Sequence, residues 1–287
     1  MANFAVPTTV KSNKKQLGQD ILNRALRSHR HDKTFLFKGL VRFESRTDHI
    51  LPTVCQHDPM ESEDCLICKY EKELKLPNIP DMIYASNILR LLYNGELLLE
   101  FNSLDALKCV DAKHLPEVKV GTSEAWQRAR SNLPPIPKAY DWTFTSDYGG
   151  TISDNIRVEE CTDSIDLEVL KRPDPIEFIE TIPLYEDEMD DNGSTEMTVR
   201  VRVMTTNFFI VCRFYLRVDG VLLRTIDSRF YSQLGWNYIL REQTRREALQ
   251  KDWTSEQKEH ALDSSQLWQY LPVVEKRSHR IYYPTAV

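Results

Sequence analysis

The sequence has few glycines and lacks the short motifs that carry common enzymatic chemistry. Its 287 residues include nine glycines, with no Gly-rich phosphate loop, no Gly-x-Ser-x-Gly and no His-Glu-x-x-His. These absences disfavour nucleotide-dependent enzymes. The seven histidines mostly stand among charged loop residues rather than beside a candidate nucleophile. We therefore expect a protein that is not an enzyme and that needs no cofactor.

Long apolar runs are also missing. No stretch approaches the roughly 20 apolar residues of a membrane-spanning helix, and residues 1–10 lack the charged start and apolar run of a secretory signal. We therefore predict a cytoplasmic protein with no membrane partner. The six cysteines are spread over the chain and do not resemble the dense framework of a small secreted domain, so reduced thiols are expected.

An excess of positive charge is absent as well. The net charge is -6, whereas a general nucleic-acid binder needs a basic surface to displace phosphate counterions. No nucleic-acid partner is expected. Residues 1–33 are an exception to the overall balance, because apolar residues at helical spacing over 16–30 alternate there with lysines and arginines. This basic amphipathic helix is either a terminal helix or a targeting or surface-docking segment.

What is present is the composition and patterning of an ordered globular protein, with 41% hydrophobic and 28% charged residues. Asn94-Gly95 is typical of a type I′ hairpin, and Val199, Val201 and Val203 alternate with arginines at the start of an antiparallel meander. Helices are expected from Asn102 or Ser103 through Cys109 and over 163–170. The irregular mixture of hairpins and helices predicts the α+β class, with residues 34–287 as a single domain.

The last hairpin of the meander gives the most specific prediction. If Asp219-Gly220 is a two-residue turn, Arg213 and Arg217 share one sheet face with Arg224, and apolar and aromatic side chains lie between them. Such a face suits a peptide that carries an acidic group or a free carboxylate, because arginine binds carboxylates bidentately. The alternative is an ordinary salt-bridged face.

Two segments resemble metal sites. Cys55, His57, Cys65 and Cys68 supply four soft ligands in a short stretch, which would suit one structural zinc ion, although the intervening residues look like flexible loop. The acidic run from Glu186 to Asp191 lacks the pattern of a calcium loop, so a solvated loop is favoured. A hydrolase that uses both segments is a remote alternative function.

Several sequence blocks in order along the chain resemble one known family. The blocks are Asp141-Trp-Thr-Phe-Thr-Ser-Asp-Tyr-Gly-Gly-Thr151, Glu100-Phe-Asn with Asp105-Ala-Leu-Lys-Cys, Leu216-Arg-Val-Asp-Gly-Val-Leu-Leu-Arg224, Asp227-Ser-Arg, Leu240-Arg-Glu and Gln269-Tyr-Leu-Pro272. They are similar to the TIPRL, or Tip-forty-one, family of type 2A phosphatase regulators. The resemblance runs from about Thr34 to Pro284 and leaves out the basic N-terminal helix and the insertion from Thr53 to about Cys65.

The resemblance implies a non-enzymatic protein that binds the catalytic subunits of type 2A, 4 and 6 protein phosphatases, restrains them and acts in TOR signalling. It also implies a cleft that holds the C-terminal tail of the phosphatase. The alternative is an adaptor that mainly binds the phosphatase-associated alpha4 protein. Matching motifs place partner contacts at Asp105, Ile165, Asp227 and Arg229, to which the hairpin adds Arg213, Arg217 and Arg224. At Thr225 and Gln243 the chain departs from the Met and Tyr expected in the family.

Overall fold

The computed structural model describes residues 30–51, 65–74, 76, 79–110, 128–129, 143–250, 253–254 and 271–284. Strands dominate these residues. The elements are β1 (His31–Phe37), β2 (Val41–Thr47), α2 (Leu66–Leu74), β3 (Met82–Ile83), β4 (Ile88–Tyr93), β5 (Glu96–Asn102), α3 (Ser103–Lys108), β6 (Thr151–Ile152), β7 (Val158–Cys161), η1 (Val169–Lys171), β8 (Ile176–Asp187), η2 (Met189–Asp191), β9 (Gly193–Met204), β10 (Asn207–Val218), β11 (Leu222–Gln233), β12 (Tyr238–Leu249) and β13 (Val273–Tyr282).

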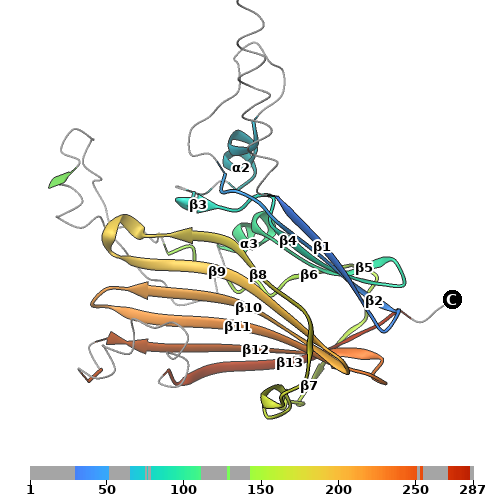
Figure 1. The fold of residues 1–287 in the computed structure, drawn as a ribbon. Helices are drawn as coiled ribbons and strands as arrows, with labels where there is room; N and C mark the ends of the chain where they lie inside the picture. The colour runs from blue at the N-terminus through green and yellow to red at the C-terminus, as the bar shows by residue number, and fades with distance from the viewer. Residues whose placement is uncertain are drawn as a thin grey trace, which may run out of the picture.

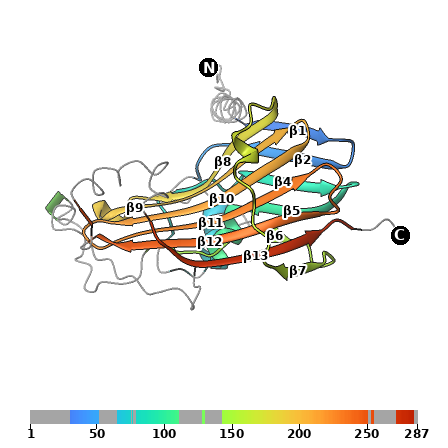
Figure 2. The same cartoon turned by 90° about the horizontal axis from the view of Figure 1, so that it is seen from below.

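The strands form two antiparallel sheets that lie one above the other in Figure 1. The smaller sheet has the order β1-β2-β4-β5-β6, and the larger has the order β3-β8-β9-β10-β11-β12-β13-β7. Figure 2 shows the strands of the long meander, β8 to β13, lying side by side in the larger sheet. The few helices and the antiparallel pairing confirm the predicted α+β class.

Aromatic side chains hold the two sheets together. Phe43 of β2 meets Phe208 of β10 with ring centroids 5.1 Å apart, and Phe101 of β5 meets Phe230 of β11 at 5.5 Å, both edge to face. All four rings are fully buried. Edge-to-face pairs add about 1 kcal/mol each to the burial of their area. The main core therefore lies between the sheets, and two smaller apolar clusters lie on the far face of the larger sheet.

Two local predictions are confirmed. Asn94 and Gly95 both have positive φ, 50° and 89°, between the paired residues Tyr93 and Glu96, as a type I′ turn requires. Asn102 caps α3, because its side-chain oxygen accepts the backbone N–H of Asp105 at 2.8 Å.

The predicted register of the β10–β11 hairpin is wrong by one residue. Val218 pairs with Leu222, so Asp219, Gly220 and Val221 form a three-residue loop. Val221 N–H closes it on Val218 O at 3.0 Å, and Gly220 has a φ of 73°. A one-residue shift moves every side chain of β11 to the opposite face of the sheet. Arg224 consequently faces the five-stranded sheet, and the prediction that it shares a face with Arg213 and Arg217 is wrong.

Other predictions also need correction. Residues 163–170 do not form an α-helix, because only the short η1 is helical there. Asp187 does not lie in a solvated loop: it ends β8, is 2% exposed, and accepts the backbone N–H groups of Asp81 and Met189. Burial raises its pKa to about 7. The predicted helix over 16–30 lies outside the described residues.

The turn between β8 and β9 is conformationally demanding. Met189, Asp190 and Asp191 all have positive φ, between 48° and 63°, a region that non-glycine residues rarely adopt. The turn ends at Gly193, where an added Cβ would lie 1.9 Å from the carbonyl oxygen of Arg217 on β10. No heavier residue fits there unless the backbones of β9 and β10 separate.

Gly193→Ala should lower the free energy of unfolding by about 3 kcal/mol, because its methyl group would overlap backbone that cannot move alone. Gly220→Ala is the matched control, since its added Cβ has no neighbour within 4 Å and only the positive φ is unfavourable, at about 1 kcal/mol. Urea unfolding measures both. Equal losses in the two variants would contradict the close approach at Gly193.

Candidate partner-binding site

The far face of the larger sheet, here called the outer face, is set by strand alternation. On β10, Cys212, Phe214 and Leu216 belong to the core between the sheets, so Arg213, Tyr215 and Arg217 point the other way. The residues that pair with these three across β11 are Asp227, Thr225 and Leu223, in that order. The outer face therefore carries both charged and apolar side chains.

Asp227 is the centre of the charged part of this face. Its carboxylate is 2% exposed and receives two hydrogen bonds from Arg213, from Nε at 2.7 Å and from Nη2 at 2.8 Å. Arg229 Nη2 donates a third, at 2.9 Å. Bidentate contacts of this kind are the strongest that a carboxylate makes with a side chain. One buried anion thus fixes two guanidinium groups.

Asp227 and Arg213 each stabilise the ionised form of the other. Burial by itself raises the pKa of Asp227, but the hydrogen bonds and charges of Arg213 and Arg229 outweigh it, and the pKa lies below its ordinary value. For Arg213, burial alone would lower the pKa, yet Asp227 and Glu196 raise it overall. At neutral pH the group is therefore an ion cluster.

Glu242 extends the cluster across β12 to β13 and to a loop. Arg229 Nη1 lies 3.8 Å from Glu242 Oε1, and Lys276 Nζ lies 2.8 Å from Oε2. The backbone N–H of Ile165 also approaches Oε2, at 3.4 Å. We call the set Arg213, Asp227, Arg229, Glu242 and Lys276 the charged belt. It connects four elements that are distant in sequence.

An apolar cluster lies on each side of the charged belt. On one side, Ile165 packs with Tyr231 and Leu240, against partly buried neighbours that include Phe209 and Trp236. On the other side the members are Tyr215, Leu223 and Leu271, with Ala248 and Trp253 against them. The outer face thus alternates apolar, charged and apolar surface. A peptide with apolar residues on either side of a polar one would match this order.

The structure brings together four of the seven residues expected to contact a partner: Ile165, Arg213, Asp227 and Arg229. Arg217 shares their face but lies near the end of the hairpin, where it pairs with Asp219 at 2.9 Å. Thr225 lies on this face as well, fully buried, between Tyr215 and Arg246 in the strand register.

Three sequence-predicted positions lie elsewhere. Arg224 is completely buried on the inner face, where its Nε is 2.6 Å from Glu247 Oε2. Gln243 is also on that side and donates from Nε2 to the carbonyl of Asp147 at 2.8 Å. Asp105 is on α3, beside the smaller sheet, where its Oδ2 accepts the Thr151 hydroxyl at 2.6 Å.

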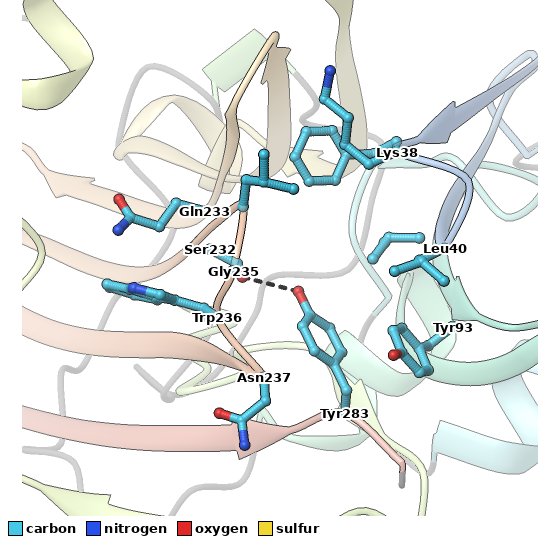
Figure 3. Close-up of a pocket in the computed structure, with 12 residues that line it drawn as sticks. Lys38, Leu40, Tyr93, Ser232, Gln233, Gly235, Trp236, Asn237 and Tyr283 are labelled. Carbon is cyan, nitrogen blue, oxygen red and sulfur yellow. Dashed lines mark hydrogen bonds between the residues drawn. The ribbon is translucent and has the colours of Figure 1, made fainter. Parts of the chain in front are cut away.

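A cavity of about 140 Å³ lies at one end of the molecule, and none of the seven residues expected to contact a partner lines it. The β1–β2 turn, the β11–β12 turn and Tyr283 line it, and Figure 3 shows the Tyr283 hydroxyl bonded to Ser232 Oγ, at 2.9 Å. Tyr93 stacks on Tyr283 with ring centroids 4.7 Å apart. The cavity is too small for a typical ligand and takes at most one side chain.

The predicted zinc ligands are only partly within the description. Cys65 and Cys68 lie at the start of α2 with their sulfur atoms 3.6 Å apart, whereas Cys55 and His57 lie outside the described residues. In the part of the chain that is described, no three potential ligands gather around one point. That same part contains no helix long and apolar enough to cross a bilayer.

Sequence reasoning missed Glu242 and Lys276 in the charged belt. Both lie on strands with many charged residues, and β12 (Tyr238–Leu249) has no apolar alternation strong enough to predict a strand. A signal was available in the Leu240-Arg-Glu block, which was used only as a mark of resemblance.

The fold defines the class of protein first: two packed antiparallel sheets, the larger of which carries the charged belt on the face turned away from the smaller sheet. The chain belongs to the TIP41-like family, whose model matches residues 82–253. This confirms the resemblance. A TIP41-like protein of Caenorhabditis elegans is 40% identical over 267 residues, which covers 91% of this chain and 94% of the relative.

More distant relatives agree. A TIP41-like protein of Homo sapiens is 36% identical over 234 residues, covering 79% of this chain and 85% of the relative. The protein named type 2A phosphatase activator TIP41 of Saccharomyces cerevisiae is 31% identical over 204 residues, covering 64% of this chain and 56% of the relative. The name of the yeast relative describes it as an activator of a type 2A phosphatase.

Asp227→Asn should lower the free energy of unfolding at neutral pH, because it leaves two partly buried arginines, Arg213 and Arg229, without their anion. The pKa of Asp227 in the folded protein lies below its ordinary value of 3.8, so its contribution is present above that value and is lost as the pH falls through the folded-state pKa. The gap between wild type and variant, measured by urea unfolding at several pH values, should narrow below about pH 4. A gap that widens toward acid would contradict this account.

Arg224→Met should destabilise the fold by about 3 kcal/mol, since it leaves Glu247, 19% exposed, without its closest cation. Arg217→Met is the control, because Arg217 is 28% exposed and pairs with an exposed Asp219; its loss should stay under about 1 kcal/mol. Thermal and urea unfolding compare the two. Similar losses would place Arg224 on the solvent side after all.

Proposed function

We propose that this chain is a non-enzymatic regulator of type 2A-family phosphatase catalytic subunits and that it binds them through the outer face of its larger sheet. The observation that carries the proposal is the charged belt between two apolar clusters, in a member of a family with two yeast relatives named type 2A phosphatase activator. The partner set includes the type 2A, 4 and 6 catalytic subunits, and the pathway is TOR signalling.

The belt suits the recognition of an extended acidic segment. Arg213 keeps 23% of its side chain exposed and Lys276 keeps 42%, so both can contact a partner without leaving Asp227 or Glu242. Because Asp227 already fixes the guanidinium groups, little side-chain entropy is lost on binding. The C-terminal tail of the phosphatase, with its free carboxylate, is the segment we propose for this position. The apolar clusters would hold the side chains on either side of it.

The proposed effect on the partner is restraint of its activity through a stoichiometric complex. The word activator in the yeast names points in the opposite direction. Restraint and activation are both compatible with one binding face. A protein that holds an immature catalytic subunit can lower the activity of that subunit in the complex and raise the amount of subunit that later becomes active. Phosphatase activity measured at increasing ratios of regulator to catalytic subunit separates the two effects.

Calorimetry with a type 2A catalytic subunit tests the proposal. Arg229→Ala should weaken binding by at least tenfold, or about 1.4 kcal/mol, because Arg229 joins Asp227 to Glu242 in the middle of the belt. Arg42→Ala is the matched control, since Arg42 is 44% exposed on the smaller sheet and its loss should leave the affinity unchanged. The unfolding midpoint of each variant establishes that it is folded under the conditions of the titration.

The same titration with a tail-deleted catalytic subunit tests the choice of segment. Weaker binding after deletion supports the tail. Equal affinity with and without the tail, together with loss on Arg229→Ala, keeps the outer face but removes the tail from the proposal. Binding to the alpha4 protein with no binding to any catalytic subunit would overturn the proposal in favour of an adaptor.

A further inference from the structure

The inner face of the larger sheet carries a second cationic group that the proposed function does not use. Side chains of β12 and β13 alternate, so Arg241, Gln243, Arg245 and Glu247 share the face turned toward the smaller sheet. Their register partners on β13 are His279, Arg277 and Glu275, with His279 directly opposite Arg241. Directly opposite residues on one face have Cβ atoms about 5 Å apart, so the side chains of Arg241 and His279 are neighbours.

The carboxylates of β12 and β13 on this face lie at its other end, and Glu160 of β7 lies opposite His279. Glu247 pairs with Arg224 at 2.6 Å and approaches Arg245 at 3.6 Å. Glu275 approaches Arg245 at 3.4 Å and pairs with Arg277 at 3.1 Å. These pairs use both Glu247 and Glu275. No carboxylate in the described part of the chain is within ion-pair distance of Arg241.

Arg241 is therefore a cation in an unfavourable environment. Burial lowers its pKa, and so does the charge of Arg277. Its Nε is buried and makes no hydrogen bond to any described residue. On the neighbouring strand β11, the register partner of Arg241 is Phe230, which is fully buried. Along β12 itself, the next residue on the inner face is Ile239, which is also fully buried. A buried guanidinium nitrogen with no hydrogen bond and no counter-ion costs folding free energy unless something compensates it.

His279 also has a buried nitrogen without a hydrogen bond, since its Nδ1 has no partner in the described part of the chain. Burial lowers its pKa, Arg241 and Arg277 lower it further, and Glu160 of β7, its exposed register partner, opposes them. Two side chains that are directly opposite in the register thus each have a buried nitrogen without a hydrogen bond to the described residues, and Arg277 lies two residues from His279 on the same face.

We propose that Arg241 and His279, with Arg277 beside them, form a binding site for an oxyanion, a phosphate group in the first place, on the inner face of the larger sheet. The guanidinium of Arg241 would donate to the oxygens of the anion, and His279 would donate from its ring. A doubly negative anion matches these groups because it supplies the counter-charge that Arg241 lacks among the described residues. The site does not depend on the proposed function, since it lies on the opposite face from the charged belt.

Thermal unfolding with inorganic phosphate at constant ionic strength, with chloride as the balancing anion, is the direct test. Phosphate should raise the unfolding midpoint of the wild-type chain in a saturable manner, as ligand linkage requires, and Arg241→Met should abolish the rise. Without phosphate, Arg241→Met should be at least as stable as the wild type, because it removes an unpaired cation beside Phe230 and Ile239. A purely structural arginine would instead leave the variant less stable.

Arg42→Met on the exposed surface of the smaller sheet is the control and should keep the full phosphate effect. The same measurement with acetate identifies the kind of oxyanion. A rise in the unfolding midpoint with phosphate alone indicates a phosphoryl group, and an equal rise with acetate indicates a carboxylate. A phosphate effect no larger than that of chloride, or an equal effect in Arg241→Met, would overturn the site.

The role of His279 is tested with sulfate, which stays doubly charged over the whole range of pH used. Sulfate should bind at least threefold more tightly at about pH 6 than at about pH 7.5, because an imidazolium binds the anion better than a neutral ring. His279→Gln should remove this pH dependence and keep some binding through Arg241. A pH dependence that persists in His279→Gln would remove His279 from the site.

Discussion

The buried carboxylate of Asp227 is the contact on which the outer face depends. It lies at the middle of the larger sheet, on the strand between β10 and β12, and three hydrogen bonds from Arg213 and Arg229 compensate its charge. The compensation is mutual, because a buried ion left without its partner costs several kcal/mol. Arg229 then approaches Glu242, which is paired with Lys276 and contacts the loop at Ile165. One carboxylate thus determines how side chains from four segments lie.

The two faces of the larger sheet use arginine differently. On the outer face, guanidinium groups surround a buried acid. On the inner face, Arg224 and Arg245 share Glu247, whereas Arg241 is adjacent to His279 and forms no ion pair with the described residues. The same residue type is therefore ion-paired and fully buried at Arg224, hydrogen-bonded to a buried acid at Arg229 and without a described counter-ion at Arg241. Strand register decides among these roles, because it decides which face each side chain occupies.

The parts of the fold that local chemistry determines could be predicted from the sequence. The Asn94-Gly95 turn and the Asn102 cap are examples, since each depends on a few adjacent residues. The register of the β10–β11 hairpin could not, because Asp219-Gly220 fits a two-residue turn as well as the three-residue loop that forms. The extra residue in the loop shifts the register by one and places Arg224 on the other face of the sheet. Strand β12 was missed because Arg241, Arg245 and Glu247 all point inward, so neither face of the strand reads as apolar in the sequence. Asp227 could be predicted as a contact residue from the Asp227-Ser-Arg block. Its ion pair with Arg213 could not, because it depends on the pairing of separate strands.

The central claim is that the outer face of the larger sheet is where a type 2A-family phosphatase catalytic subunit binds. Amide hydrogen exchange on the chain alone and in the complex tests it most directly, because it locates the interface without any substitution. The account predicts slower exchange in the segment around Ile165 and in β11 and β12, with no change in the β1–β2 turn of the smaller sheet. Protection confined to the smaller sheet, with the segment around Ile165 unchanged, would contradict it.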